Sequence, residues 1–140
     1  MQPKPKVLVV DDEERFRNTM CKLLTVRGFT ATAAGSGTEA LEKLGTEKYD
    51  VTILDVRMPE MNGVQALAEI RKVDPEVEVI VMTGYASVDT AKEIIKLGAY
   101  DFLLKPYEIE DLLEKIEAAY DRKVARKRLA GGGSRPSTSG

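Results

Sequence analysis

The chain has 140 residues, 43% of them hydrophobic, and a formal net charge of −2. This length favours one domain with one core, and the charge argues against a protein whose main task is to coat nucleic acid. A single cysteine, Cys21, excludes an internal disulfide and fits a reducing compartment. The lack of histidine excludes Ser-His-Asp and Cys-His catalysis as well as histidine metal sites. With no signal peptide and no apolar run near the roughly 20 residues of a membrane span, we expect a cytoplasmic location and no membrane contact.

Short apolar runs alternate with helical patterns along most of the chain. In chain order, the expected elements are a strand at 7–10, a helix from 16 to a stop at Gly28, a strand at 29–34, a helix at 36–44, a strand at 51–54, a helix at 62–72, a strand at 77–82, a helix at 88–97 before Gly98, a strand at 100–104 and a helix that begins near 108. Ser36 and Glu39 form a capping box at the start of the second helix, and Gly45 is its expected stop.

The alternation of strands and helices predicts an α/β fold. Consecutive βα units imply a parallel sheet with helices on both faces, and right-handed crossovers make it doubly wound. The apolar runs are rich in β-branched residues and nearly continuous, as strands buried on both faces should be. We expect a flavodoxin-like, doubly wound, five-stranded parallel sheet with strand order 2-1-3-4-5 and five helices.

The end of the chain has a different composition. Residues 121–128 include five basic residues, and residues 130–140 are rich in Gly, Ser, Thr and Pro. We interpret the basic segment as a continuation of the last helix with a frayed, solvated end, which the helix dipole favours over a contact with nucleic acid. The second segment suits a flexible linker or a sequence added for expression. We therefore expect a domain at 1–121 and a tail at 122–140.

Polar residues stand just past four of the predicted strands. Asp11 and Asp12 follow the first strand, Asp55 ends the third, Thr83 follows the fourth and Lys105 the fifth. The carboxyl ends of parallel strands share one edge of the sheet, and ligands bind there in open α/β sheets. With strand order 2-1-3-4-5, the three acids and Thr83 face one crevice, and Lys105 lies on its rim.

Three carboxylates in one small crevice repel one another. Either their pKa values rise or a cation lies among them. An all-oxygen ligand set points to a hard ion, Mg²⁺ above all, while Lys105 and the Thr83 hydroxyl supply a positive charge and a donor for phosphoryl oxygens. The combination suits attack by a carboxylate on phosphorus, which gives an acyl phosphate. Taken singly, an Asp at a strand end is more often a turn or cap residue, and Asp12 is a candidate cap of the first helix.

The motifs around these residues resemble a known family. They are Val9-Val-Asp-Asp-Glu13, Ile53-Leu-Asp-Val-Arg-Met-Pro-Glu-Met-Asn-Gly63, Met82-Thr-Gly84 and Leu104-Lys-Pro106. Together they are similar to bacterial two-component response-regulator receiver domains, with a likeness over about residues 5–121. The segments 83–87 and 97–102 are most similar to the receivers of enhancer-binding transcription regulators. The resemblance implies a phosphoacceptor signalling switch that controls an output domain for transcription.

The resemblance also implies roles for matched residues. Asp55 would be the phosphoacceptor, Thr83 would bind a phosphoryl oxygen in the active state, and Lys105 would form an ion pair with the phosphoryl group. The Lys105–Pro106 peptide bond is expected to be cis. Phe102 takes the position of the switch aromatic residue, although an aromatic there also suits the core. Phosphorylation would draw the loop after Thr83 inward and alter the surface of the fourth helix, fifth strand and fifth helix.

For the metal, the resemblance implies Asp12 and Asp55 as direct Mg²⁺ ligands, Asp11 as a ligand through water and the carbonyl of Arg57 as a further ligand. Arg57 and Tyr85 lie two residues after Asp55 and Thr83, beside the expected path of an attacking water. Because both side chains are bulky, we expect slow self-hydrolysis of the acyl phosphate, unless both point to solvent.

The implied phosphoryl donor is a phosphohistidine of a sensor histidine kinase or of a histidine phosphotransfer protein, since this chain has no histidine. The domain would catalyse only its own phosphorylation and slow autodephosphorylation, so it is not expected to be a turnover enzyme. An attached effector domain and a homodimer through the fourth and fifth helices are further candidates. We expect no direct binding of nucleic acid by this domain.

Three other interpretations fit part of the pattern. A flavodoxin-like electron carrier shares the fold, but Asp11 and Asp12 repel the phosphate of FMN unless a cation is present. A phosphatase of the haloacid dehalogenase type also forms an aspartyl phosphate, but it needs a second acid where this chain has Arg57. A receiver-like adaptor that is never phosphorylated would not need the complete set of acids, Thr83 and Lys105.

Overall fold

The structure is a computed structural model of the chain, and it describes residues 4–55, 63–84 and 88–134. These residues form strands and helices that alternate as the sequence predicts. Their bounds are β1 Lys6–Val10, α1 Glu14–Val26, β2 Thr30–Ala34, α2 Gly37–Thr46, β3 Val51–Asp55, α3 Gly63–Val73, β4 Glu78–Thr83, α4 Val88–Lys96, β5 Asp101–Leu104 and α5 Ile109–Ser134. None of the helices in this described part is long and apolar enough to cross a bilayer.

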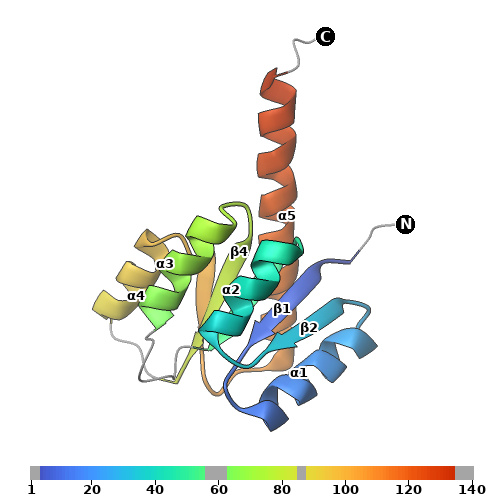
Figure 1. Ribbon diagram of the computed structural model, residues 1–140, viewed down its shortest axis with the longest axis vertical. Coiled ribbons are helices and arrows are strands. Elements are labelled where there is room, and N and C mark those ends of the chain that lie inside the picture. Colours follow the sequence, from blue (N-terminus) through green and yellow to red (C-terminus); the bar gives the residue numbers. More distant parts are fainter. Residues whose placement is uncertain (1–3, 56–62, 85–87, 135–140) are drawn as a thin grey trace.

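The strands form one parallel sheet in the order β2-β1-β3-β4-β5, which confirms the predicted topology. Helices cover both faces, as Figure 1 shows. One core cluster joins the sheet to α2, α3 and α4, and a second joins it to α1 and α5. The central strands β3 and β4 are buried throughout, whereas the edge strands β2 and β5 are mostly half-exposed. Burial on both faces therefore holds for the centre of the sheet and fails at its edges.

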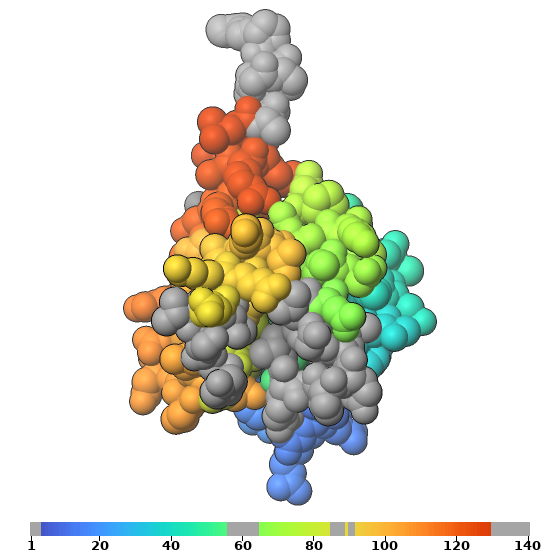
Figure 2. Space-filling view, turned by 90° about the vertical axis from the view of Figure 1, so that its left-hand side faces the viewer, coloured from blue at the N-terminus to red at the C-terminus, as the bar shows by residue number. Residues whose placement is uncertain are grey.

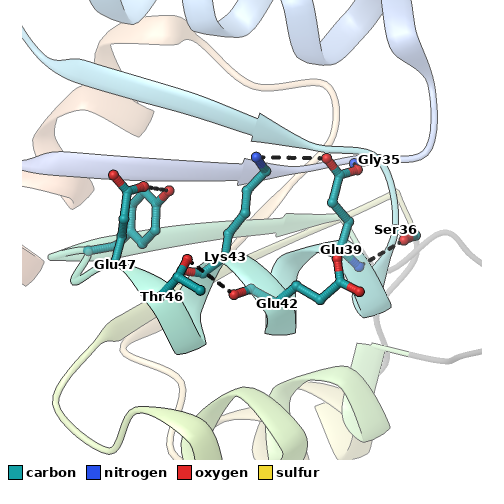
Figure 3. Close-up of polar contacts among 8 residues, drawn as sticks. Gly35, Ser36, Glu39, Glu42, Lys43, Thr46 and Glu47 are labelled. Atoms are coloured by element: carbon teal, nitrogen blue, oxygen red, sulfur yellow. Dashed lines mark hydrogen bonds and ion pairs between the residues drawn. The ribbon is translucent and has the colours of Figure 1, made fainter.

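The helix ends follow the local sequence with one exception. The Ser36 hydroxyl accepts a hydrogen bond from the Glu39 amide at 3.1 Å, and the Glu39 carboxylate accepts one from the Gly35 amide at 2.7 Å (Figure 3). Gly28 and Gly98 have φ values of 96° and 110°, as glycines after helices often do. The stop predicted at Gly45 is wrong, because α2 continues to Thr46.

The last helix is much longer than the sheet requires, and its final turns extend beyond the body (Figure 1). Figure 2 shows this extension standing clear of α3 and α4. Its first part is anchored, because Glu78 is 0% exposed and accepts hydrogen bonds from Arg122 at 3.0 and 2.6 Å. Lys123 is 7% exposed and donates to an Asp50 carboxylate oxygen at 2.9 Å. The predicted solvated helix end is therefore wrong for Arg122 and Lys123, since buried carboxylates require partners.

Candidate functional site

The sheet register brings the predicted site residues to one edge. Val10 pairs with Leu54, so Asp11 and Asp55 each lie one residue past this pair, on neighbouring strands. Asp55 in turn pairs with Met82, the residue before Thr83. On the other side of β4, Thr83 pairs with Leu104, and the Thr83 carbonyl accepts a hydrogen bond from the Lys105 amide at 2.8 Å. Four strand ends thus deliver an acid pair, a hydroxyl and an ammonium to the same place.

A short contact in this group joins Lys105 to Asp55. The Lys105 ammonium donates to an Asp55 carboxylate oxygen at 2.6 Å. The Asp55 side chain is 1% exposed and that of Lys105 is 25% exposed. A charge-assisted hydrogen bond of this length in a mostly buried setting is strong, and it holds the ammonium next to any group that joins the carboxylate.

Asp11 is also buried, and backbone groups hold it in place. Its amide donates to the Ala34 carbonyl at 3.1 Å, and its carboxylate accepts from the Glu13 amide at 2.8 Å. The Arg17 guanidinium donates to the Asp11 carbonyl at 3.3 Å. Asp12 is exposed, and the N-cap position of α1 belongs to Glu13, so Asp12 is not the helix cap.

Burial and the proximity of two acids both shape the electrostatics of the site. Burial raises the pKa of Asp11 to about 6 from its ordinary 3.8, and the hydrogen bond and negative charge of Asp55 act in the same direction. The Glu13 amide and the Lys105 charge lower it in part. Burial, with the charges of Asp55 and Asp11, also raises the pKa of Tyr107 to about 12. The site therefore favours an added cation and disfavours further negative charge.

The two buried acids supply part of the oxygen ligand set that the predicted Mg²⁺ would require. Asp11 and Asp55 offer carboxylate oxygens in mutual repulsion, which suits a hard ion that keeps several waters. In the described ranges, no three acidic or cysteine side chains lie close enough together to hold a metal, so Asp12 is not gathered into a three-acid cluster. The carbonyl of Arg57 lies outside these ranges. The donor chemistry fits Mg²⁺, and the full ligand set stays a prediction.

The remaining predicted residues have mixed outcomes. Thr83 is buried at the end of β4, within this group. Phe102 is half-buried in β5, packs against the core cluster of the α2, α3 and α4 face and pairs with Val81. The Lys105–Pro106 bond is cis, as expected. Tyr85, like Arg57, lies outside the described residues.

Two aromatic residues belong to this neighbourhood that the sequence did not single out. The Phe16 ring lies under the Lys105 ammonium, with 5.5 Å between the nitrogen and the ring centroid. The charges of both buried acids contribute to the raised pKa of Tyr107. The position of Tyr107 two residues after Lys105 was an available signal. Phe16 had none, because its spacing within α1 marks it only as a core residue.

Comparison with known protein families gives one match over most of the chain. The profile of the family described as the response regulator receiver domain matches residues 7–117. The regulatory protein AtoC of Escherichia coli K12 is 35% identical over 124 residues, which are 89% of this chain and 27% of AtoC. The transcriptional regulatory protein ZraR of the same strain is 40% identical over 113 residues, 81% of this chain and 26% of ZraR. The chain thus spans about a quarter of the length of these relatives.

Solved structures give the same result for the fold. A CheY-like response regulator receiver domain protein from Methanospirillum hungatei superposes with a TM-score of 0.82 at 28% identity, covering 88% of this chain and 98% of that one. The beryllofluoride-activated NtrC4 receiver domain dimer, solved in solution, gives a TM-score of 0.78 at 40% identity over 84% of this chain and 98% of that one.

Proposed function

Because the chain belongs to the response regulator receiver domains of two-component systems, we propose that it is a phosphoacceptor switch in which Asp55 receives the phosphoryl group. The observation that supports this most directly is the position of Asp55. Its carboxylate is buried at the end of a central strand, 2.6 Å from the Lys105 ammonium and beside Asp11. The donor is a phosphohistidine on a sensor kinase or a histidine phosphotransfer protein.

The proposed reaction is an in-line phosphoryl transfer. An Asp55 carboxylate oxygen attacks phosphorus, the P–N bond to the donor imidazole breaks, and its electron pair stays on the nitrogen. Lys105 is already in position to take a phosphoryl oxygen as a partner, and the Thr83 hydroxyl is the second donor. The carboxylates of Asp11 and Asp55 would hold Mg²⁺, which would neutralise negative charge on them and on the phosphoryl oxygens. The domain would then lose the phosphoryl group slowly and would not turn over other substrates.

The switch follows from the link between the site and β5. Lys105 and Thr83 share a backbone hydrogen bond, so movement of either toward a phosphoryl group pulls on the end of β5. Phe102, in the same strand, packs against the core cluster that includes Ile94 of α4, and it would change its packing. We propose that the α4–β5–α5 surface shifts between two arrangements and that the shifted form is a homodimer, as the activated NtrC4 receiver is described.

The output belongs to a longer protein. AtoC and ZraR are named as regulatory and transcriptional regulatory proteins, and this chain covers about a quarter of each. We propose that α5 leads into an effector domain that controls transcription, that nucleic acid contacts that domain and not this one, and that the protein acts in the cytoplasm.

The test of this function uses acetyl phosphate with Mg²⁺ as a small phosphodonor. Intact mass spectrometry should find one added phosphoryl group on the wild-type chain and none on Asp55→Asn or in the presence of EDTA. Modification of Asp55→Asn to the wild-type extent would contradict the assignment.

We also propose that the Tyr85 side chain shields the acyl phosphate from attacking water. Tyr85→Ala is therefore predicted to shorten the lifetime of the phosphoryl group, and an unchanged decay of radiolabel in that variant would refute this role.

A further inference from the structure

The Lys105 ammonium has a second neighbour besides the Asp55 carboxylate. It lies over the face of the Phe16 ring, 5.5 Å from the centroid, while its nitrogen is 2.6 Å from the carboxylate oxygen. We propose that Phe16 is a positioning residue for phosphoryl transfer, because its ring holds the Lys105 ammonium at the site through a cation–π contact. This role rests on the proposed function of Asp55.

The geometry favours such a contact over simple proximity. A lysine ammonium within about 6 Å of a ring centroid is attracted by the negative face of the ring, and the attraction grows as water is removed. Phe16 is half-buried and Lys105 is 25% exposed, so both groups are partly shielded. The two side chains also share the wall of an apolar cavity of about 350 Å³ between α1 and the start of α5.

The helix that carries Phe16 is fixed at its start to Asp11, one of the two buried acids. Phe16 lies in the first turn of α1, which begins where the Glu13 amide donates to the Asp11 carboxylate at 2.8 Å. Arg17, the next residue, donates to the Asp11 carbonyl at 3.3 Å. The ring therefore has a fixed position relative to Asp11, because α1 carries both Phe16 and the Arg17 donor to the Asp11 carbonyl.

The contact with the Phe16 ring can hold the Lys105 ammonium even when the Asp55 carboxylate no longer carries its charge. Once Asp55 becomes an acyl phosphate, the carboxylate charge that holds Lys105 is replaced by phosphoryl oxygens farther out. The contact with Phe16 does not depend on the state of Asp55, so it restrains the ammonium before, during and after transfer. Loss of this restraint should slow phosphorylation by about two- to fivefold, the range expected for a partly exposed cation–π contact.

A purely structural role for Phe16 is the competing explanation, because its side chain also packs against the α1 and α5 core. The chain supplies a matched control in the same core cluster. The Lys4 ammonium lies 5.2 Å from the Phe29 ring centroid, next to the amino ends of β1 and β2 and hence at the edge of the sheet opposite the site. Changes at Phe29 test packing and ring chemistry without touching Lys105.

The experiment replaces Phe16 or Phe29 by mono-, di- and trifluorinated phenylalanine, which keep the ring in place and weaken its negative face in steps. At Phe16, the rate of phosphorylation by acetyl phosphate should fall with each step, Phe16→Tyr should keep the wild-type rate, and Phe16→Leu should show the full loss. At Phe29, the fluorinated series should leave the rate unchanged. A flat series at Phe16, or an equal fall at Phe29, would overturn the proposal.

A second measurement on the resting protein separates this inference from the proposed function. The ε-methylene protons of Lys105, assigned by their loss in Lys105→Arg, should be displaced by the Phe16 ring current and should return toward ordinary values in Phe16→Leu but not in Phe29→Leu. If the wild type accepts no phosphoryl group, the proposed function fails, and these shifts still decide whether Phe16 holds the ammonium. Unmoved shifts in Phe16→Leu would refute the contact.

Discussion

The Lys105 ammonium lies 2.6 Å from the Asp55 carboxylate although β4 separates the strands that carry them. Lys105 reaches across the end of β4, where its own amide is tied to the Thr83 carbonyl. A buried carboxylate at a strand end would be costly without a partner, and the pairing with the Lys105 ammonium offsets part of that cost. The same ion pair therefore contributes to the stability of this edge of the sheet and to the phosphoryl transfer proposed for Asp55.

Removal of this cation should impair phosphoryl transfer. Lys105→Met is predicted to slow phosphorylation by acetyl phosphate by about tenfold to a hundredfold, because developing phosphoryl charge loses a fixed partner. The rate is measured by intact mass spectrometry. Lys115→Met is the matched control, since Lys115 also forms a 2.6 Å pair, with Asp101 away from the acids. Equal slowing in the two variants, or none in Lys105→Met, would count against the role of Lys105.

The acid pair should make stability depend on pH. The pKa of Asp11 is raised from 3.8 to about 6, so its favourable contribution is complete below about pH 3.8 and is lost as the pH rises through about 6. In EDTA, Asp11→Asn should be more stable than wild type by about 2 kcal/mol at pH 8, with a smaller difference at pH 5. Urea denaturation at both pH values measures this. A difference independent of pH would contradict the assignment to Asp11.

The anchored part of α5 should matter for folding, although the family profile ends at residue 117. A chain that stops after Asp121, at the predicted domain boundary, loses the contacts of Arg122 and Arg126 with Glu78 and that of Lys123 with Asp50. Its free energy of unfolding should fall by about 2–4 kcal/mol relative to a chain that stops after Arg128, because a buried carboxylate is left without its cations. Equal stability of the two chains in urea would place the boundary at 121 after all.

Single substitutions separate this anchor from helix length. Arg122→Met should reproduce much of that loss, since Arg122 bonds the fully buried Glu78. Arg27→Met should lower the free energy of unfolding far less than Arg122→Met, because the pair of Arg27 with Glu110 is exposed to solvent.

The activated state should differ from the resting state in α4 and β5. Beryllofluoride with Mg²⁺, a stable mimic of the phosphoryl group, is predicted to shift backbone amide signals of α4 and of Phe102 while leaving those of β2 in place. Sedimentation of the same sample should report a dimer. Unchanged α4 signals in a sample that has bound beryllofluoride would rule out this version of the switch.

The sequence was most informative where the pattern of apolar residues and the chemistry of the residue that ends a strand point to the same site. Runs of apolar residues that end on Asp55 and Thr83 placed both at strand ends, and parallel topology then brought them together. The sequence did not determine whether the Lys105 side chain would turn toward Asp55 or toward solvent, because both directions are open to a residue at the sheet edge. Contacts that depend on how a helix is rotated against the sheet, such as Phe16 with Lys105, leave no trace in spacing.

Long-range charge pairing was missed for a related reason. Glu78 interrupts an apolar run and looks like a strand boundary, while Arg122 and Arg126 belong to a basic segment that looks solvated. Their contact joins residues 44 positions apart for the Arg122 pair. The available signal was the i, i+4 spacing of the two arginines on one face of the helix.

The most direct test of the central claim is to locate the phosphoryl group by chemical trapping. After treatment with acetyl phosphate and Mg²⁺, borohydride reduces an aspartyl phosphate to homoserine, and tandem mass spectrometry of the peptides identifies the position. We predict homoserine at residue 55 alone. Homoserine at position 11 or 12 instead, or an unaltered residue 55 in chains that carry the phosphoryl group, would contradict the account.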